Sequence, residues 1–254
     1  MKKIEDIKYG SLPCQVLDVT LPDSDEFTVY IHLHGGGYEH GTHKEKFIPD
    51  LVEKGIAVVS GEYRKYPDAK YPEFIEDGAS VVSWALSNMH KYGKVNGFYV
   101  GGSSAGCHTA LMLCFCKKYL EKYGISNKDI AGYFFDAGQP TVHFNVLKEM
   151  GENPKRVVVD ERAPLYYVGE EENYPPMEFV VSDNDIANRY EQTMLTIGTL
   201  KDFGYDMSKI SLNFVKNSRH TEYWEKFDEN GKSIYAEMIY KFIKRCEDTK
   251  LKEE

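Results

Sequence analysis

The chain has 254 residues, of which 42% are hydrophobic, so it is long enough to bury one substantial core. Its formal net charge is −9, with both signs dispersed along the sequence, which argues against nucleic acid or an anionic membrane as a partner. No stretch approaches the roughly 20 apolar residues of a transmembrane helix, and residues 1–10 lack the apolar run of a secretory signal. We therefore expect a cytoplasmic protein with a single domain over residues 1–254.

The cysteine pattern fits a reducing compartment. The five cysteines are odd in number and are Cys14, Cys107, Cys114, Cys116 and Cys246. Cys114 and Cys116 lie two residues apart in a helix-like run, so they point to different sides of the helix and are expected to pack in the core. We expect neither a metal site nor a cofactor.

Strand-like and helix-like segments alternate along most of the chain. Short apolar runs predict strands at 14–21, 27–33, 56–63, 97–102, 130–138, 177–182 and 209–215. Apolar residues at three- and four-residue steps predict helices at 72–93, 105–124, 185–204 and 233–246. This alternation predicts an α/β fold with a mostly parallel sheet covered by helices on both faces. The first strands have no helix between them, so we expect an antiparallel edge there.

Residues 139–176 interrupt the alternation with at most one or two short helices. A long irregular segment in a compact domain is usually functional or mobile, so we expect a lid-like insertion. Its aromatic residues Phe144, Tyr166, Tyr167 and Tyr174 are candidates for stacking on a substrate. The alternative is that they pack the insertion onto the body of the domain.

A Gly-x-Ser-x-Gly motif follows the predicted strand at 97–102 and precedes a predicted helix. It centres on Ser104, and such a turn projects the serine hydroxyl above the sheet as a nucleophile. A serine of this kind needs a general base. His220 is the only histidine beyond residue 143 and follows the last predicted strand, so we expect it to be that base.

The base needs an orienting acid, which should follow the strand at 177–182. Asp183 comes immediately after this strand and is the expected acid. Asp185 is the rival, although it is also placed to cap the next helix. Asp160 and Asp136 are weaker candidates.

The run "HGGG" at residues 34–37 follows another predicted strand. Glycines without a Cβ let backbone N–H groups approach a developing oxyanion closely. We expect Gly36 and Gly37, together with the N–H of Ala105, to form the oxyanion hole. Gly35 would shape the loop, and His34 would brace it by hydrogen bonding.

With these parts in place, the chain resembles the α/β-hydrolase esterases and lipases that carry an HGGG oxyanion loop, in the hormone-sensitive-lipase-like and feruloyl and acetyl-xylan esterase-like branches. The motifs that carry the resemblance are "HGGGYEHG" (34–41), "EYRKYP" (62–67), "YPEFIEDG" (71–78), "GGSSAG" (101–106), "VVSDND" (180–185) and "RHTEYW" (219–224). The resemblance implies a catalytic triad of Ser104, Asp183 and His220, and a structural role for Asp77. Ser103 stands where hormone-sensitive-lipase-like members usually have an acid, and the strands begin without an N-terminal helical cap. Both departures favour the smaller acyl-esterase branch.

The resemblance implies a serine carboxylesterase that hydrolyses short-chain acyl or aryl esters through an acyl-enzyme, including acetyl or feruloyl esters of small plant-derived saccharides. The partner would be a small-molecule ester, and the expected assembly a homodimer. Two alternatives stay open. One is an N-formylkynurenine formamidase-like amidohydrolase, and the other a non-catalytic ligand-binding protein with the same fold.

Overall fold

The computed structural model describes residues 1–253, and the side chains of residues 1–250. Its strands are β1 (Lys2–Lys8), β2 (Val16–Leu21), β3 (Glu26–Leu33), β4 (Ile56–Gly61), β5 (Lys94–Ser103), β6 (Gly132–Asp136), β7 (Met177–Asn184) and β8 (Ile210–Arg219). Its α-helices are α1 (Ile48–Glu53), α2 (Glu73–Asn88), α3 (Ala105–Phe115), α4 (Lys118–Glu121), α5 (Phe144–Glu149), α6 (Arg189–Asp202) and α7 (Ile234–Glu253). No helix in the described part of the chain has the length and apolar character needed to cross a bilayer.

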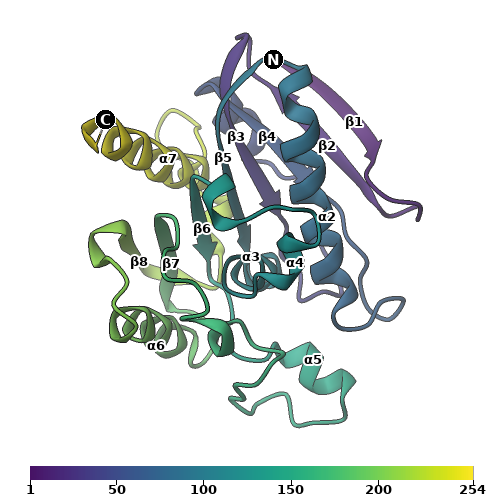
Figure 1. The fold of residues 1–254 in the computed structure, drawn as a ribbon, viewed down its shortest axis with the longest axis vertical. Coiled ribbons are helices and arrows are strands. Elements are labelled where there is room, and N and C mark those ends of the chain that lie inside the picture. Colours follow the sequence, from purple (N-terminus) through teal and green to yellow (C-terminus); the bar gives the residue numbers. More distant parts are fainter. Residues whose placement is uncertain (254) are drawn as a thin grey trace.

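The strands form one eight-stranded sheet with the order β1-β2-β4-β3-β5-β6-β7-β8. β1, β2 and β4 pair antiparallel, and all other pairs are parallel. The expected mostly parallel sheet with an antiparallel N-terminal edge is confirmed, and Figure 1 shows this edge beside α2. Parallel strands end at the same edge of a sheet, so the segments that follow β3, β5, β7 and β8 are brought together there.

Helices cover both faces of the sheet, and the alternation of side chains along the central strand β3 explains why. Val29, Ile31 and Leu33 pack into the larger core with α2 and α3, whereas Tyr30 packs into a second core with α1 and α7. A strand buried on both faces has no polar side, which accounts for its nearly continuous apolar sequence.

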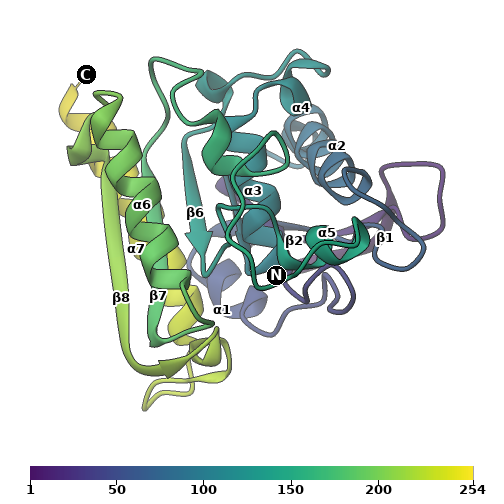
Figure 2. The same cartoon turned by 90° about the horizontal axis from the view of Figure 1, so that it is seen from below.

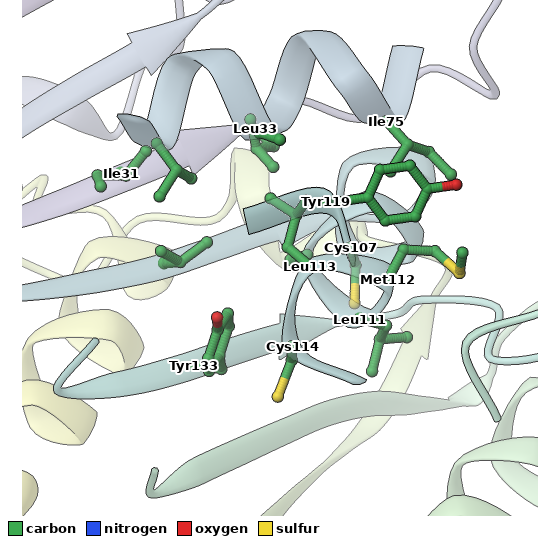
Figure 3. Close-up of a cluster of buried hydrophobic side chains, with 14 of the residues drawn as sticks. Ile31, Leu33, Ile75, Cys107, Leu111, Met112, Leu113, Cys114, Tyr119 and Tyr133 are labelled. Carbon is green, nitrogen blue, oxygen red and sulfur yellow. The ribbon is translucent and has the colours of Figure 1, made fainter. Parts of the chain in front are cut away.

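Helix α3 is buried along its whole length. Figure 3 shows Cys107, Leu111 and Cys114 of α3 among apolar side chains of the neighbouring elements. The predicted helix at 105–124 ends earlier than expected, because Cys116 leaves the helical conformation and a separate short helix, α4, follows. All five cysteines are free.

The sequence patterns did not predict β1 or α1. β1 is largely exposed and carries lysines and acidic residues, and it contacts the core only through Ile4 and Ile7. Charged side chains of this kind are common at sheet edges, where they discourage pairing with other chains. α1 is only six residues long, which is too short for a helical period to stand out.

Candidate active site

The turn between β5 and α3 holds Ser104 in a conformation that non-glycine residues rarely adopt. Its φ is 52° and its ψ is −111°, and its N–H donates to the carbonyl of Asp136. The flanking glycines leave room for the turn, because a Cβ on Gly106 would lie 2.0 Å from the carbonyl oxygen of Leu33. The strained turn presents the Ser104 hydroxyl at the carboxyl edge of the sheet.

His220 reaches this serine from the loop after β8. The distance between its Nε2 and Ser104 Oγ is 2.9 Å, although the two residues lie 116 positions apart. Its side chain is 23% exposed, so the imidazole is held in place while one side faces solvent.

The carboxylate that contacts His220 is Asp185, not Asp183. Asp185 Oδ1 lies 2.6 Å from His220 Nδ1, and the Asp185 side chain is only 2% exposed. The expectation that Asp183 orients His220 is therefore wrong for this structure. Asp183 is exposed and accepts the backbone N–H groups of Asn217 and Ser218, which lower its pKa.

The boundaries of two elements explain this exchange of roles. β7 continues to Asn184, which pairs with Arg219 of β8, so Asp183 is still a strand residue. Helix α6 begins only at Arg189, after Asn188 in a left-handed conformation and without a side-chain cap. Asp185 therefore lies in the connection between strand and helix and turns towards His220, instead of capping a helix.

Asp136, another candidate from the sequence, is hydrogen-bonded to the segment that follows His220. It is fully buried at the end of β6 and accepts hydrogen bonds from Ser103, Tyr223 and Trp224. Burial raises the pKa of Asp136, and the three donors oppose that shift. The two aromatic residues follow His220 closely, so these bonds fix the loop that carries the histidine.

The glycine loop after β3 lies directly over the serine. A Cβ on Gly35 would lie 3.4 Å from Ser104 Cβ and 2.9 Å from the Trp224 ring. Gly36 and Gly37 have φ angles of 113° and 66°, which other residues adopt only with strain. Among the described residues, no group accepts a hydrogen bond from the N–H of either glycine. The N–H of Ala105, at the first position of α3, has no partner within the helix either.

His34 braces this loop, as expected. Its Nδ1 donates to the carbonyl of Gly35 at 2.7 Å, and its Nε2 lies 2.8 Å from Glu62, a residue that sequence reasoning did not identify. Burial disfavours ionisation of Glu62, but hydrogen bonds from His34, His43 and Lys65 outweigh it and lower the pKa of the carboxyl group. The glycine loop is thus held through His34 by the ionised carboxylate of Glu62.

The insertion at 139–176 supports the same loop. Asn145 of α5 is buried and donates to the carbonyl of Gly37 at 2.6 Å. In Figure 1, α5 lies at the bottom of the view, away from the other labelled helices, and Figure 2 shows the same insertion from below. No signal in the sequence distinguished Asn145 from the other polar residues of the insertion.

The four aromatic residues of the insertion have different surroundings. Phe144 is half-buried, and its Cζ would lie 3.7 Å from a Cβ on Gly37, so it lies beside the site. Tyr166 is exposed on the surface. Tyr167 and Tyr174 are buried in the core, where their hydroxyl groups bond to backbone groups of the insertion itself. The structure does not bring these two tyrosines to the site.

Two other groups of polar side chains lie outside this constellation. Asp77 is buried and binds Arg64 through two hydrogen bonds of 2.8 Å, consistent with a structural role. Within the described residues, Asp6, Asp18 and His43 have spacing that would suit a metal ion, but Lys3 already pairs with Asp18 at 3.3 Å.

Comparison with known proteins identifies the family of this chain. A sequence model of the BD-FAE family matches residues 17–146, which is just over half of the chain. That match includes the glycine loop and the Ser104 turn and ends before Asp185 and His220.

Two curated relatives illustrate the range of similar proteins. Esterase LipC of Mycobacterium tuberculosis is 31% identical over 114 residues, covering 42% of this chain and 28% of that protein. The kynurenine formamidase of Danio rerio is 30% identical over 137 residues, covering 52% of this chain and 45% of that protein. The matches thus span less than half the length of either relative.

Solved structures show the same fold over nearly the whole chain. Esterase B from Lactobacillus rhamnosis superposes with a TM-score of 0.77, at 18% identity, covering 99% of this chain and 88% of that one. This likeness supports the α/β-hydrolase fold expected from the sequence.

Proposed function

The chain belongs to the BD-FAE family of α/β-hydrolase esterases, and we propose that it is a serine carboxylesterase with Ser104 as nucleophile, His220 as general base and Asp185 as orienting acid. The observation that carries the proposal is the pair of short contacts on His220. One ring nitrogen lies 2.9 Å from the serine hydroxyl and the other lies 2.6 Å from a buried carboxylate. This is the arrangement that activates a serine hydroxyl at neutral pH.

The reaction would proceed through an acyl-enzyme. His220 takes the Ser104 proton as the oxygen attacks the ester carbonyl, and then donates that proton to the leaving alcohol. Water, deprotonated by the same imidazole, then releases the acid and regenerates the serine. Asp185 stabilises the imidazolium that forms in each half of the reaction.

The oxyanion hole would consist of the N–H groups of Gly36, Gly37 and Ala105. Two observations support this assignment. Among the described residues no group accepts a hydrogen bond from these N–H groups, and the loop is held in place by His34 and Asn145. Preorganised donors of this kind do not need to reorient during the reaction, and loss of one typically costs ~10²–10³ in rate.

For the substrate we propose a short-chain acyl or aryl ester, including acetyl or feruloyl esters of small saccharides. The support is the family itself and the position of Phe144 beside the glycine loop, where an aromatic face can contact the bound ester. The insertion at 139–176 would act as a partial lid.

Replacing Ser104 with alanine tests the proposal. The variant should fold, keep its circular dichroism spectrum and lose turnover of p-nitrophenyl acetate, whereas retained turnover would contradict the nucleophile assignment. Labelling with a fluorophosphonate adds an independent test, because wild type should form an adduct at Ser104 and the variant should not. An unlabelled wild-type protein would favour the non-catalytic binding alternative.

A formamidase acting on N-formylkynurenine is the second candidate, favoured by the similarity to the Danio rerio enzyme over 52% of this chain. The same triad would attack an amide carbonyl instead of an ester. Comparing kcat/KM for N-formylkynurenine with values for acetyl, butyryl and feruloyl esters separates the two. A clear preference for the formyl amide would replace the esterase proposal.

A further inference from the structure

Arg189, the first residue of α6, is a buried cation whose guanidinium has no hydrogen bond or ion pair among the described residues. The residue is only 3% exposed. The Nη1 atom is buried with no acceptor. Burial lowers the pKa of Arg189, which reflects the cost of holding this charge away from water.

The described groups around Arg189 do not accept a hydrogen bond from its buried Nη1. The negative charge of Asp185 raises the pKa of the Arg189 guanidinium, but the carboxylate forms its hydrogen bonds with His220 and with the backbone N–H of Ile186. Burial, together with the charge of Arg189, lowers the pKa of His108 to about 3, so this neighbour is neutral at pH 7. Leaving a buried guanidinium without a hydrogen-bond acceptor is costly, so an acceptor supplied by a ligand would stabilise Arg189.

A cavity of about 570 Å³ has Arg189 among its lining residues. Its lining includes Phe144, Lys155, Arg156, Ile186, Arg189 and Gln192. Three of its lining residues carry a charge, and all three are basic, although the chain as a whole has a net charge of −9. A concave region lined by one sign of charge concentrates ligands of the opposite sign.

The cavity adjoins the proposed active site on two sides. Phe144 lies against the glycine loop, close enough that its ring would contact a Cβ on Gly37. Ile186 follows Asp185 directly in the chain. Through Phe144, the cavity lies next to the loop that would hold a substrate at Ser104, and recognition in the cavity requires a substituent of that substrate to reach it.

We propose that this cavity recognises a carboxylate carried by the ester substrate, with Arg189 as its main partner and Lys155 and Arg156 at the rim. The inference rests on the proposed esterase function and adds to it the class of substrate, an ester with an anionic group on its acyl or alcohol part. Arginine suits this task because its planar guanidinium binds both oxygens of a carboxylate at once.

Matched pairs of chromogenic esters test the proposal. For the acyl part, mono-4-nitrophenyl glutarate is compared with 4-nitrophenyl valerate, which has the same chain length without the charge. For the alcohol part, 4-acetoxybenzoate is compared with its methyl ester. Wild type should have the higher kcat/KM for the anionic member of at least one pair, after correction for intrinsic reactivity.

Arg189→Gln should lower that preference by about 10–100-fold, the range expected when a hydrogen-bonded charge pair is lost. Arg156→Gln should lower it in the same direction by less, because this side chain lies at the exposed rim. Lys201→Gln is the matched control, since it removes the same charge from the exposed end of the same helix, and it should leave the preference unchanged. An unchanged preference in both arginine variants would overturn the proposal, as would a wild type that favours the neutral ester in both pairs.

Thermal unfolding distinguishes this role from a structural one. Without ligand, Arg189→Gln should melt at or above the wild-type temperature, because it removes a buried unpaired charge. Added glutarate should raise the melting temperature of wild type and not that of the variant. A variant that melts well below wild type, with glutarate stabilising both equally, would indicate a structural arginine. If no ester of either charge is hydrolysed, the esterase function fails, while the glutarate shift still tests the anion site.

Discussion

Replacing Asp185 with asparagine tests which acid orients the catalytic base. Asparagine has nearly the same shape as aspartate, so the loop between β7 and α6 should keep its course. The substitution removes the negative charge that lies 2.6 Å from His220 Nδ1. It also offers an NH₂ group to this nitrogen, which favours the wrong tautomer of the imidazole.

The size of the effect follows from the contact. Asp185 has a side chain only 2% exposed, so its charge is weakly screened by water. Opposite charges about 4 Å apart interact by about 4 kcal/mol at an effective dielectric constant of about 20. Since each 1.36 kcal/mol in the barrier is tenfold in rate, losing the charge should lower kcat by about 10³-fold.

Asp183→Asn is the matched control, because it makes the same chemical change two residues away. Asp183 is exposed, and its carboxylate accepts hydrogen bonds from backbone N–H groups of β8 and from the side chain of Asn184, so kcat should stay within about threefold of wild type. The assay is the initial rate of p-nitrophenyl acetate hydrolysis at pH 7.5, with circular dichroism to verify folding. An inactive Asp183→Asn together with an active Asp185→Asn would refute this assignment.

Three further predictions concern the glycine loop and the partly buried Glu45. Gly37→Ala adds a Cβ at a φ of 66°, 3.3 Å from Asn145 Nδ2, so kcat should fall about 10–100-fold with little change in KM. An unchanged kcat in stopped-flow and steady-state assays would show that this glycine is not part of the oxyanion hole. Asn145→Ala removes the bond that holds the Gly37 carbonyl and should lower kcat about tenfold, and equal rates for variant and wild type would show that the insertion does not position the loop. Burial raises the pKa of Glu45 to about 7 from 4.5, so the folded protein binds the extra proton and the free energy of unfolding should fall by about 3 kcal/mol as pH rises from 4.5 to 7. The free energy of unfolding of Glu45→Gln, measured with urea, should not show this decrease between pH 4.5 and 7. If the free energies of the variant and of wild type changed in parallel with pH, the prediction would be wrong.

Local patterns in the sequence predicted most of the sheet and the nucleophile turn. Period-two and uninterrupted apolar runs marked seven strands, and the glycines around Ser104 marked the strained turn, because both signals are carried by residues adjacent in the chain. The sequence did not predict β1, because its charged residues suit the edge of a sheet and lack the apolar run of a core strand. The break at Cys116 escaped because apolar residues continue on both sides of it.

The sequence could not choose between Asp183 and Asp185. The choice depends on where β7 stops, and β7 continues to Asn184 because β8 provides a partner as far as Arg219. The partner strand lies more than 30 residues away in the chain, so no local sequence pattern predicts where β7 ends. The same holds for Tyr167 and Tyr174, whose burial follows from the way the insertion folds onto α3.

By itself, the sequence determined the chemical groups at the site: a serine in a glycine-rich turn, one late histidine, and three consecutive glycines after a strand. These depend on residue type and on neighbours within a few positions. Tertiary structure alone decided which carboxylate meets His220, that Glu62 and Asn145 hold the glycine loop, and that the buried Nη1 of Arg189 has no acceptor in the described part of the chain. Each of these depends on how distant segments pack against one another, and the whole sheet fixes that packing.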